Sequence, residues 1–158
     1  MLKFIPLALV SILSTQPVLA QSSPNDHLQL LRTVNRVGVS VQIDAPICAK
    51  EIYGAYFQDG SALVLCSKGD QAERLDTIRH EAWHMLQDFK DCNLPDYGLN
   101  LILPSAMVPE EVVEAVKQHY PAEAVSFEAE AFFAAAVFDA QEINELIVRQ
   151  ASECGIAL

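Results

Sequence analysis

The sequence predicts an α+β fold, in which a small three-stranded sheet packs on a mostly helical domain. Three short segments between residues 39 and 66 either alternate apolar with polar residues or are apolar throughout, as β-strands do. After residue 70, most segments have the apolar periodicity of a helix. Of the 158 residues, 51% are hydrophobic, which is enough to form a buried core. This length predicts a single domain, which we place at residues 21–158.

The charge balance argues against two classes of protein. The chain has 21 acidic residues against 10 Lys and Arg, and its formal net charge is −11. A surplus of basic side chains is what meets nucleic-acid phosphates, so we expect no nucleic-acid partner. The hydrophobic fraction is too high, and the charged fraction of 20% too low, for a disordered polymer.

The first twenty residues have the features of a signal peptide. Lys3 gives a short basic start, residues 4–13 form an apolar run too short to span a bilayer, and Val18-Leu19-Ala20 is a plausible cleavage site. An uncleaved N-terminal anchor is the less favoured alternative. We therefore expect a secreted or periplasmic protein that does not associate with a membrane once residues 1–20 are removed.

Export changes the interpretation of the four cysteines. None of them forms a C-x-x-C pair, so their spacing does not favour a metal site built from thiolates. An even number of cysteines in an oxidising compartment predicts two disulfides, for which three pairings exist. We prefer the pairing of Cys48 with Cys66 and of Cys92 with Cys154.

The predicted strands cover residues 39–43, 52–57 and 62–66. Asp59-Gly60 marks a turn between the second and the third. A tight turn at this point places Tyr53, and not Cys48, opposite Cys66. We therefore expect a longer or bulged hairpin if Cys48 and Cys66 are to form a disulfide.

Five helices are predicted from caps and apolar periodicity. Ser23 caps the first, and the D-x-x-E patterns at 70–73 and 139–142 predict capping boxes before the second and the fifth. Prolines open the third and the fourth. The predicted ranges are 24–37, 71–89, 109–119, 121–138 and 140–154.

The helix predicted at 71–89 contains the pattern H-E-x-x-H, formed by His80, Glu81 and His84. Residues four apart lie on one face of a helix, so both imidazoles can bind one metal ion. The glutamate beside the first histidine can contact a metal-bound water without displacing it, as a general base must. A solvated face that carries these residues by chance is the alternative.

The two histidines lie away from the apolar face of this helix, which is formed by Leu75, Ile78, Ala82, Met85, Leu86 and Phe89. Polar residues share the histidine side, namely Glu73, Asp76, Thr77 and Gln87. We therefore expect this helix to line a cleft.

A catalytic zinc site needs a third protein ligand and an open position for water. The other histidines, His27 and His119, do not lie at the spacing of the extended H-E-x-x-H-x-x-G-x-x-H motif. Residues 122–138 form a helix that is apolar almost all round, yet it carries Glu128 and Glu130, and a buried carboxylate is costly without a partner. Exposure or backbone hydrogen bonds account for one of the two glutamates at most, so we expect a metal ion to bind the other.

His80-Glu81-x-x-His84 followed by Glu128-x-x-Ala131 resembles the gluzincin metallopeptidases, in particular their minimal single-domain forms. The resemblance covers about residues 60–138 and implies a zincin-like domain. It implies that His80, His84 and Glu128 bind Zn²⁺ and that Glu81 is the general base, with Glu130 as the reserve third ligand. Where the family commonly has an Asp or Asn that supports a zinc-bound histidine, this chain has Phe132.

The resemblance also implies that the strand before the motif helix, residues 62–66, lies along the cleft, where an extended peptide could pair with its edge. Stabilisation of the transition state usually needs a hydrogen-bond donor in addition to the metal. Tyr97, His119 and Tyr120 are candidates, and we assign none of them a catalytic role.

The sequence therefore predicts an exported zinc-dependent metallohydrolase, most simply a peptidase that acts on a peptide or protein substrate with Glu81 as general base. The first alternative is a secreted, disulfide-stapled binding module with a structural or vestigial zinc site. An acidic periplasmic scaffold without a metal is the second. Three protein ligands and a water at the zinc favour catalysis, whereas a closed fourth position favours a structural site.

Overall fold

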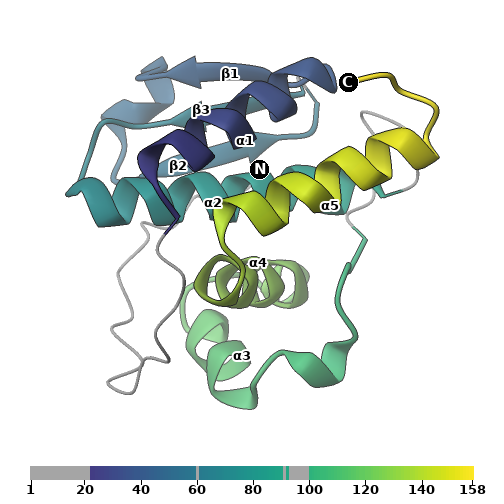
Figure 1. Ribbon diagram of the computed structural model, residues 1–158. Helices are drawn as coiled ribbons and strands as arrows, with labels where there is room; N and C mark the ends of the chain where they lie inside the picture. The colour runs from purple at the N-terminus through teal and green to yellow at the C-terminus, as the bar shows by residue number, and fades with distance from the viewer. Residues whose placement is uncertain (1–21, 60, 91, 93–99) are drawn as a thin grey trace.

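The computed structural model describes residues 22–59, 61–90, 92 and 100–158 (Figure 1). Five α-helices and three strands lie in this part of the chain, in the order α1, β1, β2, β3, α2, α3, α4 and α5. The predicted α+β class and the small three-stranded sheet are thereby confirmed. The predicted signal peptide at residues 1–20 lies outside the described residues. Among the helices of the described segments, none is long and apolar enough to cross a membrane.

The sheet has the strand order β1-β3-β2, and its strands are β1 (Ser40–Ile43), β2 (Gly54–Phe57) and β3 (Ala62–Leu65). The central strand, β3, pairs in parallel with β1 and antiparallel with β2. Our expectation that β3 offers an edge to a peptide is therefore wrong, because both of its edges are already paired. The edge strand that packs on α2 is β2 (Figure 1).

The hairpin between β2 and β3 keeps the register of a tight turn. The backbone N–H of Cys66 donates to the carbonyl of Tyr53 at 2.8 Å. The predicted disulfide between Cys48 and Cys66 is nevertheless present, with the Cα atoms 5.5 Å apart. Cys48 reaches this position because the short 3-10 helix Pro46–Ala49 lies before β2. The pairing is confirmed, and the lengthened or bulged hairpin that we expected is wrong.

The second predicted disulfide, between Cys92 and Cys154, is also present, with the Cα atoms 5.2 Å apart. Cys92 follows the C-terminal end of α2, and Cys154 directly follows α5. The bond therefore ties the end of the motif helix to the end of the last helix, and the stretch of chain between the two cysteines carries α3, α4 and α5.

The predicted helices all form, and two begin later than expected. The capping boxes predicted for α2 and α5 are present, as is the Ser23 cap of α1. In α4, the N–H of Ala124 bonds to the carbonyl of Pro121, so residues 121–124 form a turn and the helix starts after them. The bounds are α1 Pro24–Arg36, α2 Gln71–Phe89, α3 Glu110–Lys117, α4 Val125–Val137 and α5 Ala140–Glu153.

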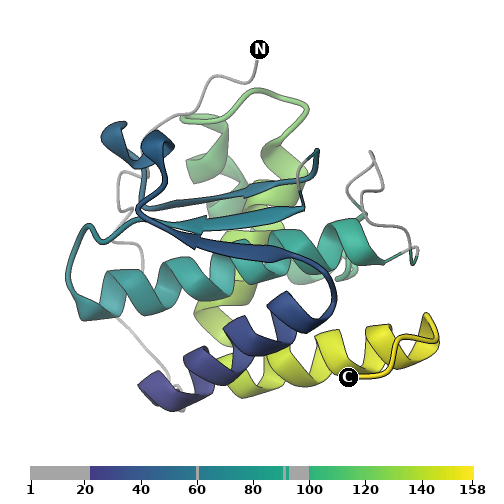
Figure 2. The ribbon, with the colours of Figure 1, turned by 90° about the horizontal axis from the view of Figure 1, so that it is seen from above.

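The motif helix α2 lies in the middle of the molecule, between the sheet and α4, while α1 and α5 lie side by side next to it (Figures 1 and 2). Every residue from 80 to 89 is buried, including Trp83, whose ring stacks on Phe138 at a centroid distance of 5.4 Å. The polar side of α2 at residues 80–89 therefore packs against α4.

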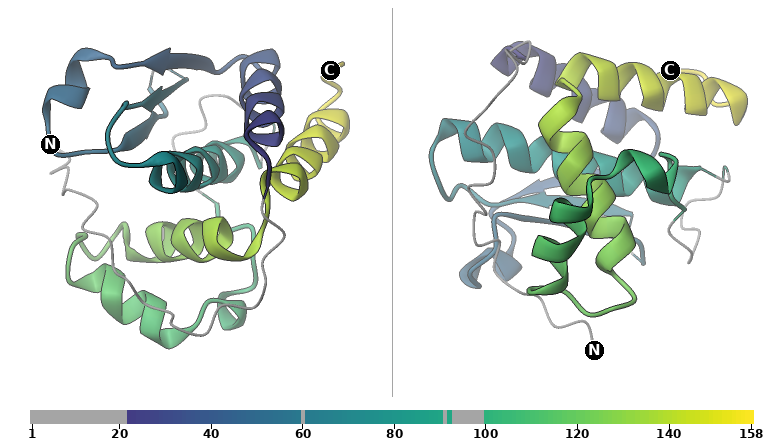
Figure 3. Two further views of the ribbon diagram at one scale, coloured as in Figure 1. Left: turned by 60° about the vertical axis from the view of Figure 1, so that its left-hand side comes forward. Right: turned by 90° about the horizontal axis from the view of Figure 1, so that it is seen from below.

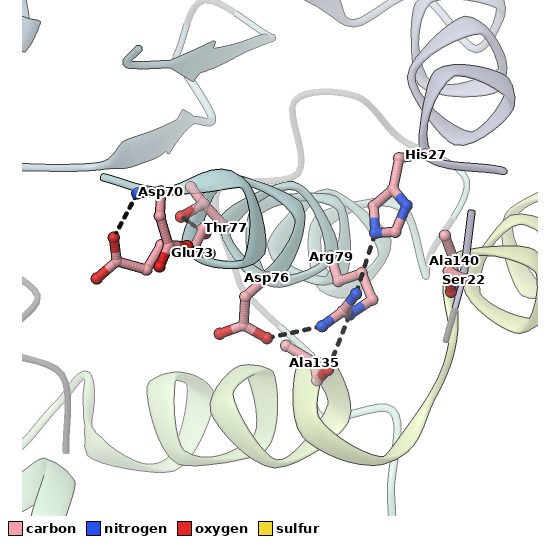
Figure 4. Close-up of polar contacts among 9 residues, drawn as sticks. All are labelled: Ser22, His27, Asp70, Glu73, Asp76, Thr77, Arg79, Ala135 and Ala140. Atoms are coloured by element: carbon pink, nitrogen blue, oxygen red, sulfur yellow. Dashed lines mark hydrogen bonds and ion pairs between the residues drawn. The ribbon is translucent and has the colours of Figure 1, made fainter. Parts of the chain in front are cut away.

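Arg79 joins three helices at one point (Figure 4). Its Nε donates to the carbonyl of Ala135, in the last turn of α4, at 2.9 Å, and its Nη2 donates to Asp76 of α2 at 2.9 Å. Its Nη1 lies 3.0 Å from Nε2 of His27, in α1. A cation at the carbonyl end of a helix is favourable, so Arg79 holds α4 in place against α2.

Candidate metal centre

Four of the predicted site residues come from two helices that cross. His80, Glu81 and His84 lie on the buried face of α2, and Glu128 lies in the first turn of α4. Figure 3 shows α4 crossing α2 on the side away from the sheet. This crossing brings the carboxylate of α4 to the imidazoles of α2.

Three side-chain atoms converge where the helices cross. The Nε2 atoms of His80 and His84 lie 3.1 Å apart. Oε2 of Glu128 lies 3.3 Å from the first of these nitrogens and 3.4 Å from the second. Oε2 has no hydrogen-bond partner within the described part of the chain. The three residues form a cluster that could hold a metal ion.

The cluster is buried and electrostatically coupled. His80, Glu81 and His84 are 3%, 4% and 7% exposed. Burial opposes the charged form of His84, but the carboxylate of Glu128 outweighs it and raises the pKa of His84 to about 9. Burial also favours the neutral form of Glu128, but the two histidines outweigh it and lower the pKa of Glu128 well below its usual range.

Glu81 lies beside the cluster without being a member of it. Burial raises the pKa of this carboxyl above its ordinary value, against the opposite effect of His80 and His84. The side chain is almost fully enclosed and close enough to both imidazoles for their charge to act on it. A carboxylate in this position can exchange a proton with a small molecule bound at the cluster.

Glu130, the reserve third ligand, points elsewhere. Its carboxylate accepts hydrogen bonds from Trp83 and Gln87 of α2 and from two backbone N–H groups, those of Ile102 and Leu103. Hydrogen bonds within the protein therefore account for Glu130, as we expected for one glutamate at most.

Phe132 lies against His80 at the position where a polar supporting residue was expected from the family pattern. The ring centroids are 4.4 Å apart. Nδ1 of His80 has no hydrogen-bond partner among the described residues. On the Nδ1 side, therefore, this imidazole is supported by packing against Phe132 and not by a hydrogen bond within the described residues.

Of the three candidate donors, Tyr120 is the one that the structure brings to the cluster. Its ring packs edge-on against Phe132, with the ring centroids 6.2 Å apart, and its hydroxyl is close enough to Glu128 for that carboxylate to act on it. Burial and the carboxylates of Glu128 and Glu81 raise the pKa of Tyr120, so its hydroxyl keeps its proton. His119 lies beyond the end of α3 and outside the cluster, and Tyr97 lies outside the described residues.

The contacts that hold β2 against α2 were not predicted from the sequence. Asp88 is fully buried and accepts hydrogen bonds from the Tyr56 hydroxyl at 2.6 Å and from Gln58 at 2.8 Å. Gly54 allows β2 to approach the helix, since a Cβ there would lie 2.6 Å from Thr77 and 3.0 Å from Glu81. A glycine at a strand start and an aspartate late in an apolar helix were the available signals.

The cluster of His80, His84 and Glu128, with Glu81 beside it, is the feature of the described chain that points to a function. No known family model, curated protein or solved structure matches this chain.

Proposed function

We propose that this chain is an exported zinc-dependent metallohydrolase of the gluzincin type, most simply a peptidase. The observation that carries the proposal is the spacing of the three converging atoms, which lie 3.1, 3.3 and 3.4 Å from one another. Ligands bound to tetrahedral zinc at roughly 2.0–2.1 Å lie about 3.3 Å apart. Two imidazoles and one carboxylate are also a ligand set of catalytic zinc sites.

The number of ligands favours catalysis over the alternative of a disulfide-stapled binding module with a structural zinc. The cluster has three members within the described residues, whereas structural zinc sites usually have four protein ligands. A three-ligand site leaves one position for water or substrate. The absorption edge of zinc in the purified protein tests this directly, because its fine structure distinguishes three protein ligands with a water from a closed set of four.

Glu81 is assigned the proton transfers of the reaction. Zinc bound at the cluster would lower the pKa of a coordinated water and polarise the scissile carbonyl. The carboxylate of Glu81 takes the proton from the attacking water and delivers it to the leaving nitrogen. The raised pKa of Glu81 supports this role, since a base that must hold a proton and release it works best with a pKa nearer neutrality. The Tyr120 hydroxyl supplies a donor for the negative charge that develops on the carbonyl oxygen.

The free edge of β2 supports a peptide substrate. Tyr53 bonds to Cys66 of the partner strand, so in the alternating antiparallel pattern the N–H and C=O groups of Gly54 and Tyr56 point away from β3. The N–H of Tyr56 already acts on the carboxylate of Glu81, so an extended peptide can pair with the groups of Gly54 and with the carbonyl of Tyr56. This edge lies next to the proposed base, because a Cβ on Gly54 would come within 3.0 Å of Glu81.

Metal analysis and one substitution test the proposal. We expect the natively purified protein to contain one zinc per chain and to hydrolyse a mixture of unstructured peptides. Glu81→Gln should keep the zinc and reduce hydrolysis by about 10²–10⁴-fold. Glu123→Gln is the matched control, because Glu123 is an exposed glutamate in the turn before α4 and should leave both properties unchanged. A native protein without zinc, or full hydrolysis by Glu81→Gln, would exclude this function.

Export has its own test. Sequencing the N-terminus of the protein recovered from the periplasm or the medium should show that the chain begins at Gln21. A chain that stays in the cytoplasm with Met1 intact would contradict the proposed localisation and leave the hydrolase proposal to be decided by the zinc measurement.

A further inference from the structure

Gln87 joins the metal cluster to the interior of the protein. Its side chain is fully buried, and its Oε1 lies 2.8 Å from Nδ1 of His84. Its Nε2 lies 3.0 Å from the carboxylate of Glu130 and 3.1 Å from the carbonyl oxygen of Phe127. Both ends of the amide therefore have partners, on α2 at one end and on α4 at the other.

These contacts determine which way the amide faces. A backbone carbonyl can only accept a hydrogen bond, so the group of Gln87 that faces Phe127 must be the NH₂. The amide oxygen then faces His84, and it too can only accept. Nδ1 of His84 must therefore carry a proton, and in the neutral ring the lone pair is on Nε2, the atom that lies in the metal cluster.

Glu130 anchors this arrangement to two other parts of the chain. Its Oε1 accepts from Nε1 of Trp83 at 2.8 Å, and its Oε2 accepts from the backbone N–H of Leu103 at 2.9 Å. The N–H of Ile102 lies 2.9 and 3.0 Å from the two oxygens. A carboxylate held by this many donors is a fixed acceptor for Gln87.

The two imidazoles of the cluster are supported differently. His84 has the hydrogen bond to Gln87, whereas Nδ1 of His80 has no partner in the described part of the chain and its ring rests on Phe132. A hydrogen bond to the distal nitrogen fixes the tautomer and the angle of a metal-binding histidine. In this chain that support comes from α2 itself, three residues after the histidine.

We propose that Gln87, anchored by Glu130, is a positioning residue that holds His84 in the Nδ1–H tautomer and directs its Nε2 lone pair at the metal position. The role rests on the proposed zinc site but goes beyond it, because three ligands could bind zinc without any contribution from Gln87.

Two substitutions separate positioning from a merely structural role. Zinc affinity is measured on the full chain with its disulfides intact, by competition with a fluorescent chelator. Gln87→Met keeps the volume and removes the acceptor, and zinc affinity should fall by about 10–100-fold. Gln87→Glu keeps an oxygen facing His84, and affinity should stay close to that of the wild type. A merely structural role predicts that Gln87→Glu loses more zinc affinity than Gln87→Met. The glutamate lacks the donor to Phe127 and adds a charge beside Glu130, so it disturbs the packing more.

Asp88→Asn is the matched control. Asp88 is the next residue of α2 and is also fully buried, but it accepts hydrogen bonds from Tyr56 and Gln58 on the sheet side of the helix. We expect this variant to bind zinc like the wild type. Equal loss of affinity in Asp88→Asn and Gln87→Met, or no loss in Gln87→Met, overturns the positioning role.

A measurement on the wild type keeps the proposal testable if the variants do not fold. With ¹⁵N-labelled histidine in the zinc-loaded protein, His84 should bind through Nε2 and carry on Nδ1 a proton that exchanges slowly with solvent. Binding through Nδ1, or rapid exchange of that proton, overturns the proposal. A wild type that binds no zinc overturns the proposed function itself, whereas wild-type binding with an unaffected Gln87→Met overturns the positioning role alone.

Discussion

The ring of Phe132 rests on the imidazole of His80, with 4.4 Å between the ring centroids. Because Nδ1 of His80 has no hydrogen-bond partner among the described residues, this contact restrains the ring. Phe132→Ala should reduce the free energy of unfolding by about 2 kcal/mol, less than for a fully buried Phe because the side chain is half-buried, and should weaken zinc binding. Denaturant unfolding and chelator competition measure the two effects. Phe132→Leu, which keeps apolar volume, is the control, and undiminished zinc affinity in Phe132→Ala would contradict the restraint.

Tyr120→Phe should slow hydrolysis without releasing the metal. The substitution keeps the packing of the ring against Phe132 and removes the hydroxyl that faces Glu128. If that hydroxyl stabilises the developing oxyanion, kcat should fall by about 10²-fold with little change in KM. Steady-state kinetics and zinc affinity are measured on the same preparations. A parallel fall in zinc affinity would show instead that Tyr120 acts by orienting Glu128.

Gly54→Ala should disturb both stability and activity. The added Cβ would lie 2.6 Å from Cγ2 of Thr77 and 3.0 Å from Cγ of Glu81, so strand and helix must move apart. Overpacking of this kind costs about 1–3 kcal/mol. Gly38→Ala is the control, because a Cβ there meets nothing within 4 Å and only its φ of 101° is strained. We expect the thermal unfolding temperature to fall in both variants and the rate of hydrolysis to fall only in Gly54→Ala. Equal rates of hydrolysis in the two variants would contradict the close contact of Gly54 with the proposed base.

His27 should make the protein less stable in mild acid. Its Nδ1 donates to the carbonyl of Ser23, and its Nε2 must accept from Arg79, which can only donate. Burial, together with the charge of Arg79, lowers the pKa of His27 from its ordinary 6.5. The folded state therefore keeps His27 neutral while the unfolded chain binds a proton below pH 6.5. The free energy of unfolding should be unaffected by this group above that pH and fall below it by up to about 1.4 kcal/mol per pH unit.

His27→Gln provides the comparison for this pH dependence, since an amide can make the same two hydrogen bonds and does not titrate. Denaturant unfolding is followed from pH 8 to pH 5 with EDTA present, so that loss of metal contributes to neither protein. The difference between the two proteins should grow as the pH falls below 6.5, and a constant difference would argue against titration of His27.

Local signals in the sequence were sufficient to predict which segments form helices. Asp70 and Glu73 form the predicted reciprocal hydrogen bonds, and α2 begins and ends at the predicted residues. The start of α4 was placed too early because Pro121 opens a turn and not the first turn of the helix. The residues that cap a helix act locally, and an apolar residue such as Ala124 has no capping side chain that would mark the real start.

The ligand set was predictable in part. The i, i+4 spacing places His80 and His84 together from helix geometry alone, and a carboxylate on a buried helix requires a partner. Which carboxylate meets the imidazoles depends on how α4 crosses α2. Two residues of helix turn the side chain by about 200°, so Glu128 reaches the cluster and Glu130 points to the loop at 102–103.

The strand order could not be read from the sequence. Residues 62–65 are buried on both faces, which is consistent with a central strand, but the chain alone does not say which strands flank them. The parallel pairing of β1 with β3 requires the chain to cross over through β2, and this long-range choice moves the free edge from β3 to β2.

The disulfide between Cys92 and Cys154 and the metal cluster restrain the same stretch of chain. The cysteines are 62 residues apart, and Glu128 lies in the loop that they close. A cation held by His84 and Glu128 would attach that loop to α2 a second time. Either link reduces the conformational entropy of the unlinked loop, so the second link then costs less entropy to form. Formation of the disulfide and binding of the metal should therefore favour each other reciprocally. Thiol reductants should therefore lower the affinity of the cluster for a cation that neither sulfur contacts. The redox state of the compartment should in turn determine when the metal centre assembles.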